Sequence, residues 1–239
     1  MKKIIIGAII ILLAAVALSL ALFRQTEFSY SGVIEAVEID VPSRLGDVII
    51  KLNIDEGSNI KQGDILASLE CKAVNLQYEI AKKEFERARN LLKTSAGSQE
   101  NFDLKKHQYD MAALQRQWCD ILSPIDGKVL YKYYEQGDFI AAGRKLATVA
   151  DIRQVNAWVY VEHDLLAKLS PGQKVRGYLP EAGKHFDGII LTINDEAEFT
   201  PKNVQTRKER TRLVFGVKTR FVNDEKLTLK PGMTLEVSF

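Results

Sequence analysis

Cysteine is scarce in this 239-residue sequence, which contains only Cys71 and Cys119. Neither lies near the N-terminus, which excludes a lipoprotein signal, and the two are not paired at the spacing of a zinc site. The three histidines, His107, His163 and His185, are too scattered along the chain to indicate a metal cluster. We therefore expect no bound metal.

Catalytic motifs are missing as well. The sequence has no phosphate-binding Walker loop, no G-x-S-x-G nucleophile motif and no dinucleotide-binding glycine fingerprint. It has no low-complexity tract and no acidic or basic tail, and its net charge of +2 favours no class of partner. We expect a protein that is not an enzyme and carries no cofactor.

Charge is missing from one long stretch near the N-terminus, residues 4–23. About 20 residues at 1.5 Å each make a helix of roughly 30 Å, the thickness of the hydrocarbon core of a bilayer. Lys2 and Lys3 favour a cytoplasmic start, so we predict a single-pass anchor over residues 1–23 and place the rest of the chain outside the inner membrane. Ser19-Leu20-Ala21 is a small-x-small site, so a cleaved signal peptide is the alternative. The chain is exported in both cases, which does not favour a nucleic-acid partner.

Residues 71–122 have the pattern of two helices folded back on each other. In the first arm, apolar or small residues recur at steps of three and four, the spacing of a helix that buries one narrow seam: Cys71, Val74, Tyr78, Ala81, Phe85, Ala88 and Leu92. Small residues at positions 94–98 predict a turn, and the Ser98 hydroxyl can cap the next helix by accepting from the amide of Glu100 or Asn101. The second arm, residues 99–122, has a more polar seam: Phe102, Tyr109, Ala112, Ala113, Arg116 and Cys119. Ser123-Pro124 is expected to end this arm, and each arm of about 22 residues is roughly 33 Å long.

An internal repeat flanks the hairpin. The pattern G-x-x-I-x-x-G-x-x-L-A-x-[LV] occurs at Gly57–Leu69 and again at Gly137–Val149, each time after a G-x-V triplet, Gly46–Val48 and Gly127–Val129. The glycines predict tight turns with positive φ, followed by short strands. Two copies of one unit that bury a face against each other predict a pseudo-symmetric sandwich.

These repeats resemble the two halves of a biotinyl/lipoyl domain. A lipoyl domain split by a helical hairpin is similar to the HlyD-type periplasmic adaptor, or membrane fusion, family, and the resemblance spans nearly the whole chain. Ser123–Val129 is similar to the family's segment that re-enters the lipoyl half after the hairpin. The predicted fold is therefore mainly β with a coiled-coil hairpin: an anchor at 1–23, a connecting strand region at 24–45, lipoyl-like halves at 46–70 and 123–150, the hairpin at 71–122, and a small β-barrel at 151–239.

The barrel is predicted from alternating strands separated by turns, near residues 155–161, 174–179, 188–193, 212–219 and 235–239, with a short helical turn at 163–169. In the family such a barrel follows the lipoyl half, and the segments 198–206 and 229–237 look like family sequence. Many members continue into a membrane-proximal domain. We expect that domain to be absent here or reduced to strands from residues 25–40.

Arg87, Leu91 and Ser98 have the spacing R-x3-L-x6-S, which resembles the tip signature of adaptors that dock onto TolC-like outer-membrane channels. An exposed guanidinium and a hydroxyl can make directional hydrogen bonds, and a leucine can fill a shallow groove between channel helices. The alternative is a chance match of three common residues on a polar helix.

The two cysteines face each other near the base of the hairpin if the turn centres near residue 96. A disulfide between Cys71 and Cys119 would clamp the arms where they leave the lipoyl halves, in the oxidising periplasm. Bridging needs Cα atoms within about 7 Å, whereas helix axes usually lie about 8–10 Å apart, so two buried thiols are the alternative. Glu70–Ala73 faintly resembles the modified-lysine turn of lipoyl carriers, but Lys72 begins a helix, so no attached cofactor is expected.

A basic run is predicted to lie in a solvated loop, with contact to a transporter or to lipid headgroups as the alternative. Its members are Lys202, Arg207, Lys208, Arg210 and Arg212.

The resemblance implies a periplasmic adaptor subunit of a tripartite exporter, anchored in the inner membrane of a Gram-negative cell. Several copies, often six, would form a ring around an inner-membrane transporter, and their hairpins would meet a TolC-like channel to export small molecules or peptides. The segment P-x-N-V-Q-T at residues 201–206 favours an ABC transporter over a proton-driven pump. Two other classes stay open: a periplasmic structural or binding protein whose hairpin meets a different coiled-coil partner, and an exported carrier-domain protein. No residue indicates which substrate is exported.

Overall fold

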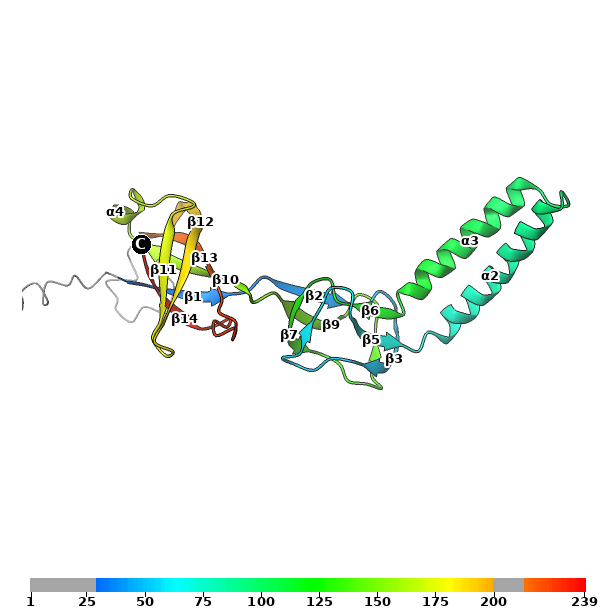
Figure 1. Cartoon of the computed structure of the whole chain (residues 1–239), viewed down its shortest axis with the longest axis horizontal. Helices are drawn as coiled ribbons and strands as arrows, with labels where there is room; N and C mark the ends of the chain where they lie inside the picture. Colours follow the sequence, from blue (N-terminus) through cyan, green and yellow to red (C-terminus); the bar gives the residue numbers. More distant parts are fainter. Residues whose placement is uncertain (1–28, 200–212) are drawn as a thin grey trace, which may run out of the picture. The chain divides into compact units, whose positions relative to one another are not determined.

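The structure is a computed structural model that describes residues 29–199 and 213–239 (Figure 1). The predicted anchor at 1–23, the P-x-N-V-Q-T segment and the basic run lie outside the described residues. Within those residues, we find no helix that is both long and apolar enough to cross a bilayer. The described chain divides into two compact units: residues 35–155 with 222–231, and residues 156–221 with 232–239 and the chain up to Ile34.

The first unit contains the repeat, which folds into two four-stranded antiparallel sheets. Their strands are β2 (Glu38–Pro42), β3 (Asp47–Leu52), β4 (Asn59–Ile60), β5 (Ile65–Leu69), β6 (Asp120–Leu122), β7 (Gly127–Lys132), β8 (Phe139–Ile140) and β9 (Lys145–Ala150). The orders are β2-β9-β7-β4 and β6-β5-β3-β8, so each half of the repeat lends its two-residue strand to the sheet of the other half. One apolar core, which includes Leu66 and Leu146 with no exposed surface, is shared by both halves. The predicted pseudo-symmetric sandwich is therefore present.

The two halves exchange equivalent hydrogen bonds. The Gly57 amide donates to the Val129 carbonyl and the Gly137 amide donates to the Ile49 carbonyl, each at 2.8 Å. Both glycines have positive φ, 82° and 97°, as the turn pattern predicted. These bonds make Ile49 the equivalent of Val129, so the predicted alignment of the G-x-V triplets, which paired Val48 with Val129, is wrong by one residue. The pleat explains the difference, because Ile49 and Val129 point into the core while Val48 is only partly buried.

The hairpin consists of α2 (Lys72–Lys93) and α3 (Gln99–Gln117), inserted between the paired strands β5 and β6 (Figure 1). The second helix ends at Gln117 rather than at Leu122, and Ser123-Pro124 is not what ends it. The Cys119 carbonyl accepts a hydrogen bond from the Leu69 amide at 2.8 Å, and residues 120–122 then pair with β5 as β6. The backbone therefore leaves the helix early to join the sheet.

The second unit is a closed barrel of six strands in the order β1-β10-β13-β12-β11-β14. The remaining elements are β1 (Tyr30–Glu35), β10 (Gln154–Val161), α4 (His163–Leu166), β11 (Lys174–Leu179), β12 (Lys184–Phe199), β13 (Leu213–Val222) and β14 (Thr234–Ser238). The predicted connecting strand region contains two strands that serve different sheets: β1 pairs with β14 in the barrel and β2 pairs with β9 in the sandwich. The barrel thus combines one strand that precedes the sandwich in the sequence with five strands that follow it.

Candidate docking site on the helical hairpin

Four aromatic side chains form a ladder along the seam between α2 and α3. Phe85 stacks on Tyr109 with ring centroids 5.2 Å apart and lies 5.6 Å from Phe102, while Tyr78 continues the ladder 5.6 Å from Tyr109. Small residues of the predicted seam are buried between the arms: Ala81, Ala88 and Ala112. The predicted helical seam is therefore present in both arms. Stacked aromatic rings add about 0.5–1.5 kcal/mol per pair beyond the burial of their area, so this ladder holds the two arms in one register.

Polar residues join the arms beside the ladder. The Lys105 ammonium lies 2.6 Å from a carboxylate oxygen of Glu84 on the other arm, and this hydrogen bond lowers the pKa of Glu84 below its ordinary value. The Arg116 guanidinium lies 4.6 Å from the ring centroid of Tyr78. The polar residues of the second arm thus connect the helices through charge and cation–π contacts, with Arg116 itself remaining exposed.

The tip is built by a Schellman motif, a feature that the sequence analysis missed. The Ala96 amide donates to the Leu91 carbonyl at 2.9 Å and the Ser95 amide donates to the Leu92 carbonyl at 3.1 Å. Ser95 adopts the left-handed conformation (φ 58°) in which this position usually contains glycine. Because a serine stands there instead, the sequence pattern did not indicate the motif. The Gly97 amide also donates to the Leu91 carbonyl at 3.1 Å. The backbone of Leu91 is therefore held in place by the turn.

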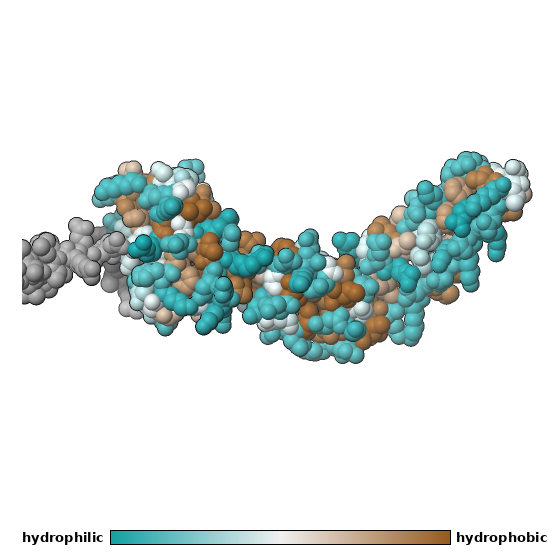
Figure 2. Space-filling model, in the orientation of Figure 1, coloured by the Kyte–Doolittle hydropathy of each residue, from teal (hydrophilic) through white to brown (hydrophobic). Residues whose placement is uncertain are grey.

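Of the predicted tip residues, Leu91 and Ser98 flank this turn, whereas Arg87 lies about one helical turn further down α2. Leu91 keeps 40% of its surface exposed although its backbone is pinned, and Arg87, four residues earlier, is exposed on the same face of α2. Ser98 is exposed, and its hydroxyl accepts a hydrogen bond from the Asn101 amide at 3.2 Å, so it caps α3 as predicted. The hydroxyl proton of Ser98 can still be donated to another group. In Figure 2 hydrophobic residues show near the far end of the hairpin and also along its arms.

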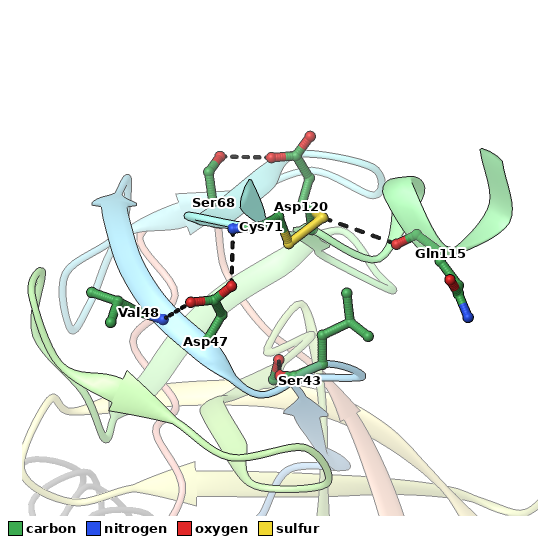
Figure 3. The surroundings of a disulfide bond; sticks show 9 residues. Ser43, Asp47, Val48, Ser68, Cys71, Gln115 and Asp120 are labelled. Atoms are coloured by element: carbon green, nitrogen blue, oxygen red, sulfur yellow. Dashed lines mark hydrogen bonds between the residues drawn. A yellow bond between two sulfur atoms is a disulfide. The ribbon is translucent and has the colours of Figure 1, made fainter. Parts of the chain in front are cut away.

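The base of the hairpin contains the two cysteines, which the structure joins in a disulfide (Figure 3). Their Cα atoms are 6.0 Å apart, inside the limit of about 7 Å for bridging. Asp47 accepts hydrogen bonds from the amides of Cys71 and Val48, at 3.0 and 2.8 Å, and ties the start of α2 to β3. Cys71 itself is left-handed (φ 49°). The bond therefore closes the hairpin where both arms meet the sheet.

Residues 37–152 match the family model of the barrel-sandwich hybrid domain of RND membrane fusion proteins. This part of the chain is therefore a barrel-sandwich hybrid domain of the membrane fusion protein type. A UPF0194 membrane protein of Citrobacter koseri is 32% identical to this chain over 127 residues, which are 53% of this chain and 38% of the relative. The chain thus matches less than half the length of this relative. The HlyD-type assignment within the family stays a prediction.

Solved structures show the same fold at low sequence identity. A MacA–MexA chimera that contains the MexA α-hairpin domain of Pseudomonas aeruginosa has a TM-score of 0.69 at 19% identity, over 88% of this chain and 79% of the chimera. A membrane fusion protein of Streptococcus pneumoniae has a TM-score of 0.62 at 18% identity, over 88% of this chain and 97% of that one. These likenesses show that the described part of the chain has the fold of these two proteins.

Metal-ligating side chains are not gathered anywhere in residues 29–199 and 213–239: no group of three or more His, Cys, Asp or Glu residues could hold an ion. His163 contacts the Asp164 carboxylate at 2.7 Å, and His185 packs against the ring of Tyr178 with centroids 4.8 Å apart. Lys72 follows the disulfide and pairs with Glu70, at the start of α2.

Proposed function

We propose that this chain is a periplasmic adaptor that connects an inner-membrane transporter to a TolC-like outer-membrane channel through its hairpin tip. The observation that supports the proposal is the geometry of the tip. The Leu91 side chain is exposed while the turn holds its backbone by hydrogen bonds, and Arg87 and Ser98 are exposed as well. Its mechanism is connective rather than catalytic. The leucine side chain would fill a groove between channel helices, while the guanidinium and the hydroxyl would donate hydrogen bonds around it.

Rigidity of the hairpin supports this role. The aromatic ladder, the Lys105–Glu84 pair and the closed base fix the arms to each other, so the tip can meet a partner with little ordering cost. A hairpin of roughly 33 Å cannot span a periplasm alone. The channel would have to project inward to meet it.

The remaining parts of the proposal concern the membrane and the assembly. Residues 1–23 would form a single-pass inner-membrane anchor, or a signal peptide, and the sandwich and barrel would pack around the transporter. The P-x-N-V-Q-T segment favours an ABC transporter, with a proton-driven pump as the other candidate. Several copies, often six in the family, would form a ring that encloses the conduit for small molecules or peptides.

Site-specific photocrosslinking in intact cells tests the channel contact. A crosslinker at position 87, 91 or 98 should capture an outer-membrane channel, identified by mass spectrometry. The matched control is Leu76, which is 64% exposed near the base of the same hairpin, and it should not capture the channel. Capture of only self or soluble partners from all three tip positions would overturn the proposal and favour a periplasmic binding protein with another coiled-coil partner.

Substitutions separate docking from folding. Arg87→Ala and Leu91→Ala should abolish channel capture and export, whereas Arg89→Ala, which removes an equal charge from the same helix, should leave both intact because Arg89 lies over the Phe85 ring. Ser98→Asn keeps a side-chain oxygen for the helix cap but removes the hydroxyl. If this variant fails to dock although its helix content is unchanged, the Ser98 hydroxyl makes a contact with the partner.

A further inference from the structure

A cavity of about 310 Å³ lies at the base of the hairpin, far along the helices from the tip. It is formed where β2 and β6, the edge strands of the two sandwich sheets, lie beside each other and meet the last turns of α3. Its walls are mainly apolar: Ile39, Val41, Pro42, Leu114, Ile121 and Leu122. Its size is at the lower end of the roughly 300–1,000 Å³ typical of small-molecule sites.

Two hydrogen-bond donors at this cavity have no acceptor within the described part of the chain. The indole nitrogen of Trp118 is buried without a partner. The Arg44 guanidinium lies 5.9 Å from the Trp118 ring centroid and is exposed, and no described carboxylate pairs with it. A buried donor without a partner costs about 1–3 kcal/mol, so the missing acceptor calls for a physical explanation.

The two carboxylates that line the cavity, in contrast, each accept a hydrogen bond already. Asp40 accepts from the Thr148 hydroxyl at 2.6 Å and from the Lys145 ammonium at 3.5 Å, and the Thr148 bond is the main cause that lowers the pKa of Asp40. Asp120 accepts from the Ser68 hydroxyl at 2.6 Å. The Gln117 side-chain amide also lines the cavity and can donate as well as accept, so the donors left without acceptors among the described residues are those of Trp118 and Arg44.

We propose that this cavity binds a small, largely apolar molecule that carries an anionic, hydrogen-bond-accepting group. The apolar body lies against Leu114 and Ile121, and the anionic group accepts from Arg44. Rotation of the Trp118 side chain, which no hydrogen bond of its indole opposes, would bring its N–H towards the same group. A ligand here touches both sheets and α3, so it contacts the joint between the hairpin and the sandwich. The site is separate from the tip and does not depend on the proposed channel contact.

Two dyes that share one ring system test the proposal on the full chain. Anilinonaphthalene sulfonate has the apolar rings and an anionic group, and N-phenylnaphthylamine has the same rings without it. The chain has two tryptophans, so Trp158→Phe leaves Trp118 as the only indole that reports binding. The sulfonate should quench Trp118 emission saturably and shift the Trp118 indole N–H resonance downfield, and the neutral dye should bind at least about tenfold more weakly because it lacks the charge-assisted bond.

Arg44→Gln should weaken the sulfonate by at least about tenfold and leave the neutral dye unchanged. The matched control is Arg144→Gln, which removes an equal charge from an exposed residue of the same unit that does not line the cavity. The absence of saturable quenching would overturn the proposal. So would equal affinity for the two dyes, or an equal effect of the two arginine substitutions, because either result means non-specific association with apolar surface.

Discussion

The disulfide at the base of the hairpin makes a quantitative prediction. Replacing Cys71 and Cys119 together with alanine removes the bond without leaving an unpaired thiol. Both side chains are buried, at 1% and 8% exposure, and alanine is small enough to fit both places. The chain should still fold, with a hairpin base that opens more easily.

The expected loss follows from the length of the closed loop. The bond joins residues 48 positions apart, for which the chain-entropy model gives a stabilisation of about 4 kcal/mol. Part of the loop is helical and can keep some structure in the unfolded state, so this value is an upper estimate. A measured loss of about 2–4 kcal/mol agrees with the reasoning.

A second variant separates the bond from the backbone around it. Cys71 holds a left-handed conformation (φ 49°, ψ 31°), which costs a non-glycine residue about 1 kcal/mol. Cys71→Gly with Cys119→Ala should therefore be more stable than the double alanine variant by about 1 kcal/mol. The difference in stability between the two variants measures the strain at the start of α2. The loss that remains in the glycine variant, relative to the parent chain, measures the contribution of the disulfide.

Urea unfolding of the full chain measures both quantities. Trp118 directly precedes Cys119, so its emission in a Trp158→Phe background follows the base of the hairpin. Thiol alkylation without reductant should label neither cysteine of the parent chain. A loss below about 1 kcal/mol for the double alanine variant would refute the clamp, and equal stability of the glycine and alanine variants would refute the strain.

Three further predictions concern the turn, the seam and the barrel. Ser95→Gly should stabilise the hairpin by about 0.5–1 kcal/mol, measured by thermal unfolding, because the native φ of 58° suits glycine. The hydrogen bond from Lys105 lowers the pKa of Glu84 in the folded protein below its unfolded value of about 4.3. The stability that this ion pair adds is therefore present above about pH 4.3 and is lost as the pH falls through the folded pKa. Glu84→Gln should make the melting temperature less dependent on pH in this acid range. Gly177→Ala should destabilise the barrel by about 1–3 kcal/mol in urea, because the added Cβ would lie 2.8 Å from the Phe221 ring.

Each of these predictions has a control or a contrary outcome. A Ser95→Gly variant that gains nothing would mean that the serine is not strained. If the melting temperature depends on pH in the same way with and without the Glu84 carboxylate, the Lys105–Glu84 ion pair does not stabilise the hairpin. Gly46→Ala, whose added Cβ would meet nothing closer than 3.4 Å, should cost clearly less than Gly177→Ala.

The sequence pattern predicted those parts of the fold that depend only on interactions within one segment of the chain. The seam of α2 follows from apolar residues at helical spacing, since a helix turns the same face to its partner wherever that spacing recurs. The cap at Ser98 and the positive φ of the repeat glycines follow from side-chain chemistry within a few residues. The repeat itself revealed the sandwich because both copies must bury the same face.

Long-range pairing decided the parts that the sequence analysis missed. The end of α3 depends on β5, whose Leu69 amide captures the Cys119 carbonyl. The division of residues 31–41 into β1 and β2 depends on β14 and β9, which lie more than a hundred residues away. No local pattern records these partners, because each strand would have the same alternation in either sheet.

The sequence by itself determined the family resemblance, the order of the elements and the three residues placed at the tip. Tertiary structure alone decided that the Leu91 backbone is pinned by the turn, that Cys71 and Cys119 lie within bonding reach, and that Trp118 and Arg44 meet at one cavity. The physical reason is that periodicity and capping act within about one helical turn, whereas contacts between β2, β6 and α3 exist only once distant segments have packed together.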